Sequence, residues 1–214
     1  MIAALYLVLT VATSFMSFQT IQLRLAEALT ALPALFPSGI LGVFAGCLLS
    51  NLLNPSPLGL VDVIAGSATT LFAAYLTWIT ARPLRHELAR RLRNEGASGS
   101  LQGHTQSLYH CLRDEGASEA PKENMDNCNR EHGRKSVFVL KVTALLPSVI
   151  LNALVVGFYL PFLLSENTPS IWLIFGTMGS ILLSQALVVY GLGLPLITAL
   201  QSTPWAKRIY LTER

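Results

Sequence analysis

Long apolar stretches without a single Lys, Arg, Asp or Glu dominate the chain. A helix needs about 20 mainly apolar residues to cross the hydrocarbon core of a bilayer. The apolar positions run on continuously, without the alternation that is typical of a membrane β-strand. The pattern therefore predicts an all-α membrane protein. The uncharged runs are residues 1–23, 28–61, 63–81, 142–165 and 167–206.

Proline, glycine and polar clusters divide these runs into six apolar segments. The second segment is short enough to be re-entrant, but six spans give the best account of the chain. We therefore predict a bundle of six transmembrane helices. The predicted spans are residues 1–18, 25–36, 39–53, 60–80, 137–160 and 172–200.

The first apolar segment has neither the basic start nor the small-residue cleavage site of a signal peptide. We therefore interpret it as a permanent span. It begins at Met1 without any polar flank, and we expect the natural chain to start upstream.

Charge is scarce and unevenly placed. Only 13% of the residues are charged and 52% are hydrophobic, and the mean hydropathy is +0.51. Residues 82–135 hold 18 of the 27 charges. About a quarter of a soluble domain is charged, so this composition excludes a soluble enzyme, a disordered chain and a nucleic-acid binder.

The distribution of Lys and Arg predicts the orientation, because basic residues accumulate in cytoplasmic loops. With six spans, thirteen basic residues fall on one side and Arg24 alone on the other. We expect a multi-pass protein of the plasma membrane with both termini in the cytoplasm. Its predicted parts are helices one to four in 1–80, a charged and flexible cytoplasmic loop in 81–136, helices five and six in 137–200, and a basic tail in 201–214.

Strongly polar residues inside the spans gather in the outer half of the predicted bundle. Ionisable groups at membrane depth cost about 2.5–3.5 kcal/mol each on insertion scales, and they persist where they face a cavity or a partner. Their shared depth predicts a polar ligand pocket that opens to the outside. The candidate residues are Gln22, Arg24, Glu27, Asn51, Asp62, Asn152 and Gln185.

Each of these residues also has a purely structural interpretation. Arg24 and Glu27 are three positions apart and would pair on a helix. Asp62 would favour the start of the fourth span, where unpaired N–H groups and the helix dipole attract a carboxylate. Asn51 and Asn152 would hold neighbouring helices together by hydrogen bonds. The pocket hypothesis is preferred because it accounts for the whole set.

Several motifs, in order along the chain, together resemble the queuosine-precursor transporter (QueT) family, whose members are substrate-binding S components of energy-coupling-factor (ECF) importers. The resemblance covers residues 1–80 and 140–200. The motifs include Gln22-x-Arg24-x-x-Glu27-Ala28-Leu29-Thr30, Gly59-Leu60-Val61-Asp62, Asn152-Ala153-Leu154 and Tyr190-x-x-Gly193-Leu194-Pro195.

The resemblance implies a six-helix S component that captures a queuosine precursor outside the cell. It also implies partners, namely a coupling transmembrane subunit and two ATPase subunits. The small residues Ala4, Val8 and Ala12 form the stripe expected to contact the coupling subunit. The chain has Ser184-Gln185 where the family usually has Gly-Glu, which puts a carboxylate role at that position in doubt.

The residues match the chemistry of a deazapurine. The N1–H group and the exocyclic amine of a deazaguanine suit carboxylates, which Glu27 and Asp62 supply, and its O6 suits donors such as Asn, Gln and Arg. Queuine fits the same donors, and the sequence does not choose between the two ligands.

Other classes of function fit less well. The sequence has no G-x-x-x-x-G-K-[ST] phosphate loop, which predicts a transporter subunit without its own ATPase site rather than an enzyme. No predicted span contains a His, which argues against an intramembrane enzyme. The His and Cys residues of the loop lack metal-site spacing, so neither metal nor cofactor is predicted. The alternative is a standalone secondary transporter of a small nucleobase-like or vitamin-like solute.

Overall fold

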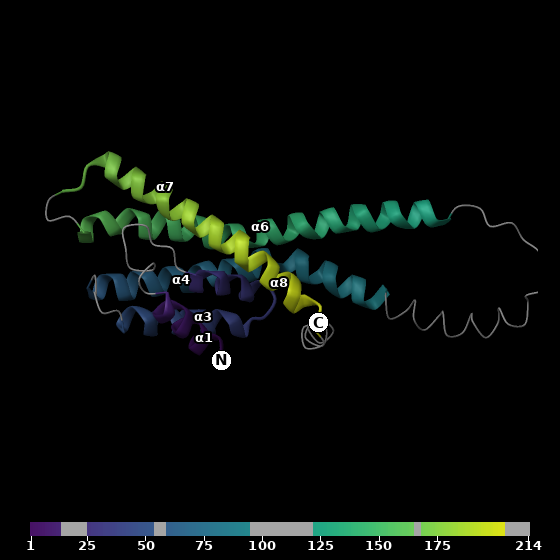
Figure 1. Ribbon diagram of the computed structural model, residues 1–214, viewed down its shortest axis with the longest axis horizontal. Helices are drawn as coiled ribbons and strands as arrows, with labels where there is room; N and C mark the ends of the chain where they lie inside the picture. Colours follow the sequence, from purple (N-terminus) through teal and green to yellow (C-terminus); the bar gives the residue numbers. More distant parts are fainter. Residues whose placement is uncertain (14–24, 54–58, 95–121, 165–167, 204–214) are drawn as a thin grey trace, which may run out of the picture.

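The computed structural model of the protein describes residues 1–13, 25–53, 59–94, 122–164 and 168–203, with side chains from residue 136 onward in the fourth range (Figure 1). Every regular element in these ranges is a helix. The predicted all-α membrane fold is thereby confirmed.

The helices form one bundle, in which α1 packs on α3, α3 on α4, α4 on α6 and α6 on α7. Figure 1 shows the longest helix, α6, continuing well beyond the other elements at one end. The elements are α1 (Ile2–Ala12), η1 (Leu25–Ala34), α3 (Ser38–Leu52), α4 (Leu60–Thr80), α6 (Lys122–Leu164), α7 (Ile171–Val188), η2 (Val189–Gly193) and α8 (Leu194–Gln201).

The second apolar segment forms the centre of the bundle. It is a 3₁₀ helix, η1, whose residues from Ala26 to Ala34 are all buried, and it contacts α1, α3, α4, α6, α7, η2 and α8. A 3₁₀ helix rises about 2.0 Å per residue, so ten residues reach about 20 Å, against about 15 Å in an α-helix. The tighter winding lets a short segment traverse the interior.

Small residues allow the neighbouring elements to approach η1 closely. A Cβ atom on Gly193 of η2 would lie 3.1 Å from the Cβ of Ala31, and one on Gly39 would lie 3.0 Å from the backbone nitrogen of Pro33. Arg85 fixes the far end of η1, because its guanidinium donates to the carbonyl of Ala34 at 3.2 Å. A cation at a helix C-terminus also compensates the helix dipole.

Glycines also set the contact between α1 and α3. Gly42 and Gly46 are four residues apart on α3, which is the spacing of close helix pairs in membranes. A Cβ on Gly46 would lie 2.6 Å from the Cβ of Tyr6, and one on Gly42 would lie 2.8 Å from the Cβ of Ile2. Tyr6 is thereby held against α3, with its hydroxyl group directed at η1.

The last apolar segment is one continuous helical run through α7, η2 and α8. Its middle part, η2, is a π-helix of five residues. Such turns are frequent at functional sites and change the direction of a helix. Here the π-turn brings Gly193 onto η1.

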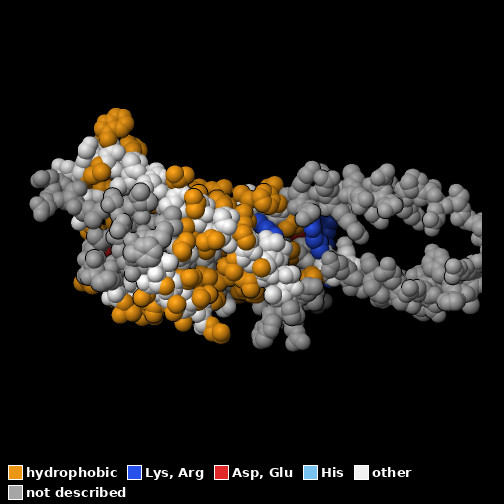
Figure 2. Space-filling model, in the orientation of Figure 1, with side chains coloured by type: hydrophobic (Ala, Val, Ile, Leu, Met, Phe, Trp, Pro, Cys, Tyr) orange, Lys and Arg blue, Asp and Glu red, His pale blue; other side chains and the backbone are white. Residues whose placement is uncertain are grey.

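Three helices in the described part of the chain are long and apolar enough to cross a membrane: Leu60–Thr80, Ser136–Leu163 and Ile171–Gln201. The shorter apolar helices Ile2–Ala12, Leu25–Ala34 and Ser38–Leu52 coincide with the other three predicted spans. Hydrophobic side chains are abundant on the face of the bundle shown in Figure 2. Exposed residues such as Phe72, Phe138 and Leu183 form an apolar surface suited to lipid.

Basic side chains gather at one end of the bundle, beyond α4 (Figure 2). Residues 82–94 form a further helix, whose apolar residues Leu88, Ala89 and Leu92 pack against the core. Arg85 lies inward and stacks 5.1 Å from the centre of the Trp78 ring. This helix therefore belongs to the bundle, and the 81–136 segment is helical at both ends, since α6 begins at residue 122.

The α1–α3 contact predicts opposite effects for two Gly-to-Ala substitutions. Gly46→Ala forces a Cβ into Tyr6, and overpacking of this kind costs about 1–3 kcal/mol. Gly176→Ala on α7 meets no atom within 4 Å and gains about 0.5–1 kcal/mol of helix propensity. Thermal unfolding in detergent should show a lower melting temperature for the first variant only. Equal shifts would contradict the packing described.

Candidate functional site

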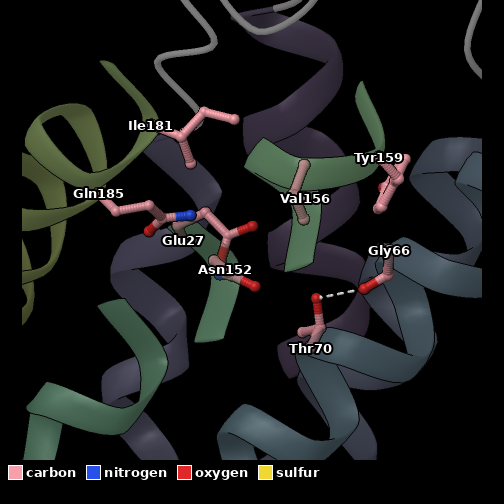
Figure 3. Close-up of a pocket in the computed structure, with 8 residues that line it drawn as sticks. All are labelled: Glu27, Gly66, Thr70, Asn152, Val156, Tyr159, Ile181 and Gln185. Atoms are coloured by element: carbon pink, nitrogen blue, oxygen red, sulfur yellow. Dashed lines mark hydrogen bonds between the residues drawn. The ribbon is translucent and has the colours of Figure 1, made fainter. Parts of the chain in front are cut away.

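Four elements, η1, α4, α6 and α7, enclose a polar cavity inside the bundle (Figure 3). Glu27 comes from the first turn of η1, and Gln185 comes from α7. Apolar contacts are supplied by Val156 and Ile181. The complete lining is Glu27, Gly66, Thr70, Asn152, Val156, Tyr159, Ile181 and Gln185.

The carboxylate of Glu27 is the central charged group of this cavity. Its side chain is only 3% exposed. The hydroxyl group of Tyr6 donates to Oε1 at 3.1 Å, and the amide of Asn152 donates to Oε2 at 3.3 Å. Each carboxylate oxygen carries further lone pairs, so the group can still accept a hydrogen bond from a ligand.

A second carboxylate, Asp62, lies beside the cavity. The hydroxyl group of the lining residue Tyr159 donates to its Oδ1 at 2.7 Å. Asp62 lies in the first turn of α4, and Gly59, which has a φ of 99°, precedes that helix. The carboxylate of Asp62 therefore links α4 to α6 by a hydrogen bond. Its position at the start of α4 also favours its negative charge.

Asn51 lies behind the cavity wall rather than in it. Its amide donates to the Sγ of Cys47 at 3.7 Å, and a Cβ on Gly66 would lie 3.2 Å from its nitrogen. Gly66 lines the cavity, and its missing side chain lets Asn51 pack close behind it. The hydrogen bond to Cys47 stays within α3, and Asn51 meets α4 by close packing against Gly66.

Gln185 faces the cavity with its amide. The side chain is 8% exposed, and its Oε1 has no hydrogen-bond partner in the described part of the chain. An unpaired buried acceptor costs about 1–3 kcal/mol. Such a group marks a position where a partner atom is missing.

The cavity is small in this conformation. Its volume is about 20 Å³, which is room for about one water molecule. A bicyclic base is far larger, so the walls must separate before one can bind.

The structure brings together three of the residues predicted from the sequence: Glu27, Asn152 and Gln185 all line the cavity. Asp62 lies beside the cavity and accepts a hydrogen bond from the lining residue Tyr159. Asn51 does not line the cavity. Gln22 and Arg24 lie outside the described residues, as does any pairing of Arg24 with Glu27.

Besides the apolar lining residues Val156 and Ile181, sequence reasoning missed four residues of the site: Tyr6, Gly66, Thr70 and Tyr159. Helical spacing could have found three of them. Tyr159 follows Asn152 by seven residues, and Gly66 and Thr70 follow Asp62 by four and eight, so each shares a helix face with a predicted residue. Tyr6 gave no such signal, because no other polar group of α1 faces the cavity.

The stripe formed by Ala4, Val8 and Ala12 lies on the exposed face of α1. The buried face of the same helix carries Tyr6 and Thr10. The stripe is therefore open to lipid or to another protein.

One known protein family matches nearly the whole chain. The family model described as QueT transporter matches residues 1–202. The chain belongs to the QueT transporter family. Searches of curated proteins and of solved structures found no significant match.

Membership of the QueT transporter family agrees with the apolar helices. The protein is a membrane-embedded transporter, and its cargo is a small molecule. The cavity, with one buried carboxylate and one unpaired amide, is the part of the described structure best suited to hold a polar cargo.

The hydrogen bond from Tyr6 to Glu27 predicts a measurable difference between two tyrosines. Tyr6→Phe removes a donor to a buried carboxylate, which costs about 1.5–3 kcal/mol. Tyr190→Phe removes a bond to the neutral carbonyl of Val142, which costs about 0.5–1.5 kcal/mol. Chemical or thermal unfolding in detergent should therefore rank Tyr6→Phe as the less stable variant. The reverse order would show that Tyr6 does not hold the carboxylate.

Proposed function

We propose that this protein is the membrane-embedded substrate-binding subunit of an ATP-driven ECF importer. Its substrate is a queuosine precursor, either a 7-deazaguanine derivative or queuine, which it captures from outside the cell. The observation that carries the proposal is a buried carboxylate, Glu27, that faces an unpaired amide, Gln185, across one cavity.

The donor and acceptor pattern of this cavity complements a deazaguanine. Carboxylate and amide oxygens together accept from the ring N–H group and the exocyclic amine, and an amide nitrogen donates to the ring carbonyl. The side chains of Val156 and Ile181 supply apolar contacts for the faces of a flat ring. Asp62 stands beside the cavity as a second acceptor, linked to it through Tyr159. A 7-aminomethyl group would place its positive charge near this carboxylate.

The two ends of α4 support an orientation for the bundle. Asp62 lies in its first turn, and Arg82 and Arg85 follow its last residue. Twenty residues of helix separate Asp62 from Arg82, which is about 30 Å. Since basic residues favour the cytoplasmic side, the basic end faces the cytoplasm, the cavity end faces outward, and both termini are cytoplasmic.

Energy must come from other subunits under this proposal. The sequence contains no G-x-x-x-x-G-K-[ST] phosphate loop. The exposed stripe of Ala4, Val8 and Ala12 offers a surface of small side chains on which a coupling subunit can approach closely. Two ATPase subunits would act through that partner.

The binding proposal is tested by Glu27→Gln, with Glu87→Gln as the matched control. Glu87 lies in the helix of residues 82–94 at the basic end, where it pairs with Arg91. Removing a charged acceptor costs about 1.5–3 kcal/mol, which is about a 10- to 150-fold rise in Kd. Calorimetric titration of purified protein with 7-deazaguanine should show this rise for Glu27→Gln and none for Glu87→Gln.

Asp62→Asn extends this test to the second carboxylate. It should weaken a 7-aminomethyl ligand more than the uncharged base, because only the former carries a positive charge. Unchanged affinities in both the Glu27 and the Asp62 variant would contradict the assignment of the cavity.

Reconstituted uptake separates the ECF proposal from a standalone secondary transporter. In proteoliposomes, uptake that requires ATP together with the coupling and ATPase subunits supports the proposal. Uptake by this chain alone, driven by a proton or sodium gradient, would contradict it. Ala4→Leu and Ala12→Leu should impair the ATP-driven uptake without changing ligand affinity, because bulky residues keep the partner helix at a distance.

A further inference from the structure

Gln185 differs from every other polar residue of the cavity in lacking an internal partner. Glu27, Asn152, Tyr159 and Thr70 are all hydrogen-bonded within the described residues. The Oε1 of Gln185 is buried and accepts nothing from that same part of the chain. In Figure 3 the amide of Gln185 points toward Glu27, with its nitrogen on the side of that residue.

Gln185 is the polar residue of its turn of α7 that faces the cavity. Ile181, one turn earlier on α7, lines the same cavity, and Ser184 turns its hydroxyl group back to the carbonyl of Ile181 at 3.2 Å. The adjacent serine is therefore satisfied locally, while the glutamine is directed into the cavity.

We propose that Gln185 is a specificity-determining residue that reads the lactam edge of the ligand. Its Oε1 accepts from the ring N1–H group, and its amide nitrogen donates to the neighbouring ring carbonyl. This inference rests on the function proposed above and deepens it. It assigns the substrate to bases that carry an N–H group next to a C=O group, such as a 6-oxo-7-deazapurine.

Three features favour this pairing over a water molecule alone. A carboxamide offers one acceptor and one donor side by side, which is the complement of a lactam. Glu27 lies opposite and is placed to accept from the adjacent exocyclic amine. A site built to hydrogen-bond a substrate group rejects the analogue without it strongly, because the site's polar atoms are then left unpaired.

The variant Gln185→Met distinguishes a role of Gln185 in ligand recognition from a purely structural role. Methionine has a similar length and no hydrogen-bonding requirement, so the variant removes the unpaired acceptor from the ligand-free protein. We expect the melting temperature without ligand to equal or exceed that of the wild type. We expect the affinity for 7-deazaguanine to fall at least about tenfold. A residue with a merely structural role would lower the melting temperature.

A second experiment tests which ligand group Gln185 recognises. It compares 7-deazaguanine with 2-amino-7-deazapurine, which lacks the carbonyl and the N1–H group, by calorimetric titration. Wild-type protein should prefer the first by at least about tenfold, and Gln185→Met should bind the two alike. Ser184→Ala, whose hydroxyl group does not line the cavity, should keep the wild-type preference.

The outcomes distinguish the two proposals. If wild-type protein binds no 7-deazapurine, the proposed function fails and this inference fails with it. A different outcome is that wild-type protein binds 7-deazaguanine and Gln185→Met keeps both the affinity and the preference over 2-amino-7-deazapurine. The proposed function then stands, and the proposal that Gln185 recognises the lactam edge is overturned. In that case a water molecule is the only partner of Oε1.

Discussion

A carboxylate buried inside a protein must be hydrogen-bonded by the groups around it, and the structure depends on meeting this requirement at Glu27. Burying an unpaired charge is far more costly than burying a paired one. The donors come from α1 and α6, two elements far apart in the sequence, and η1 lies between them. Gly46 of α3, which lets Tyr6 pack closely, therefore supports the same carboxylate from another helix.

The central helix η1 connects the two ends of the bundle. Glu27 lies in its first turn, and the carbonyl of Ala34, its last residue, accepts from Arg85 at the basic end. Thr30, midway along η1, shares a hydrogen bond with Ser148 of α6. Side chains of other elements therefore hold η1 at its start, its middle and its end.

Much of the fold could be predicted from the sequence. Helix content and segment boundaries follow from runs of uncharged residues, and α4 was predicted within its observed bounds, Leu60–Thr80. The nature of η1 could not be predicted, because a 3₁₀ helix of ten residues is set by close packing against Gly39 and Gly193 rather than by local preference. In the site, buried polar residues identified Glu27, Asn152 and Gln185. The roles of Tyr6 and Tyr159 required tertiary structure, because a tyrosine in an apolar helix is as common at a lipid interface as beside a carboxylate.

The structure of the ligand-bound protein tests the central claim most directly, since the cavity as it stands has room for about one water molecule. A structure solved with 7-deazaguanine should place the base between η1, α4, α6 and α7, with N–H groups of the ligand within hydrogen-bonding distance of Glu27 and Gln185. The walls should stand further apart than they do in Figure 3. Ligand bound elsewhere, with the Glu27 cavity still closed, would contradict the account.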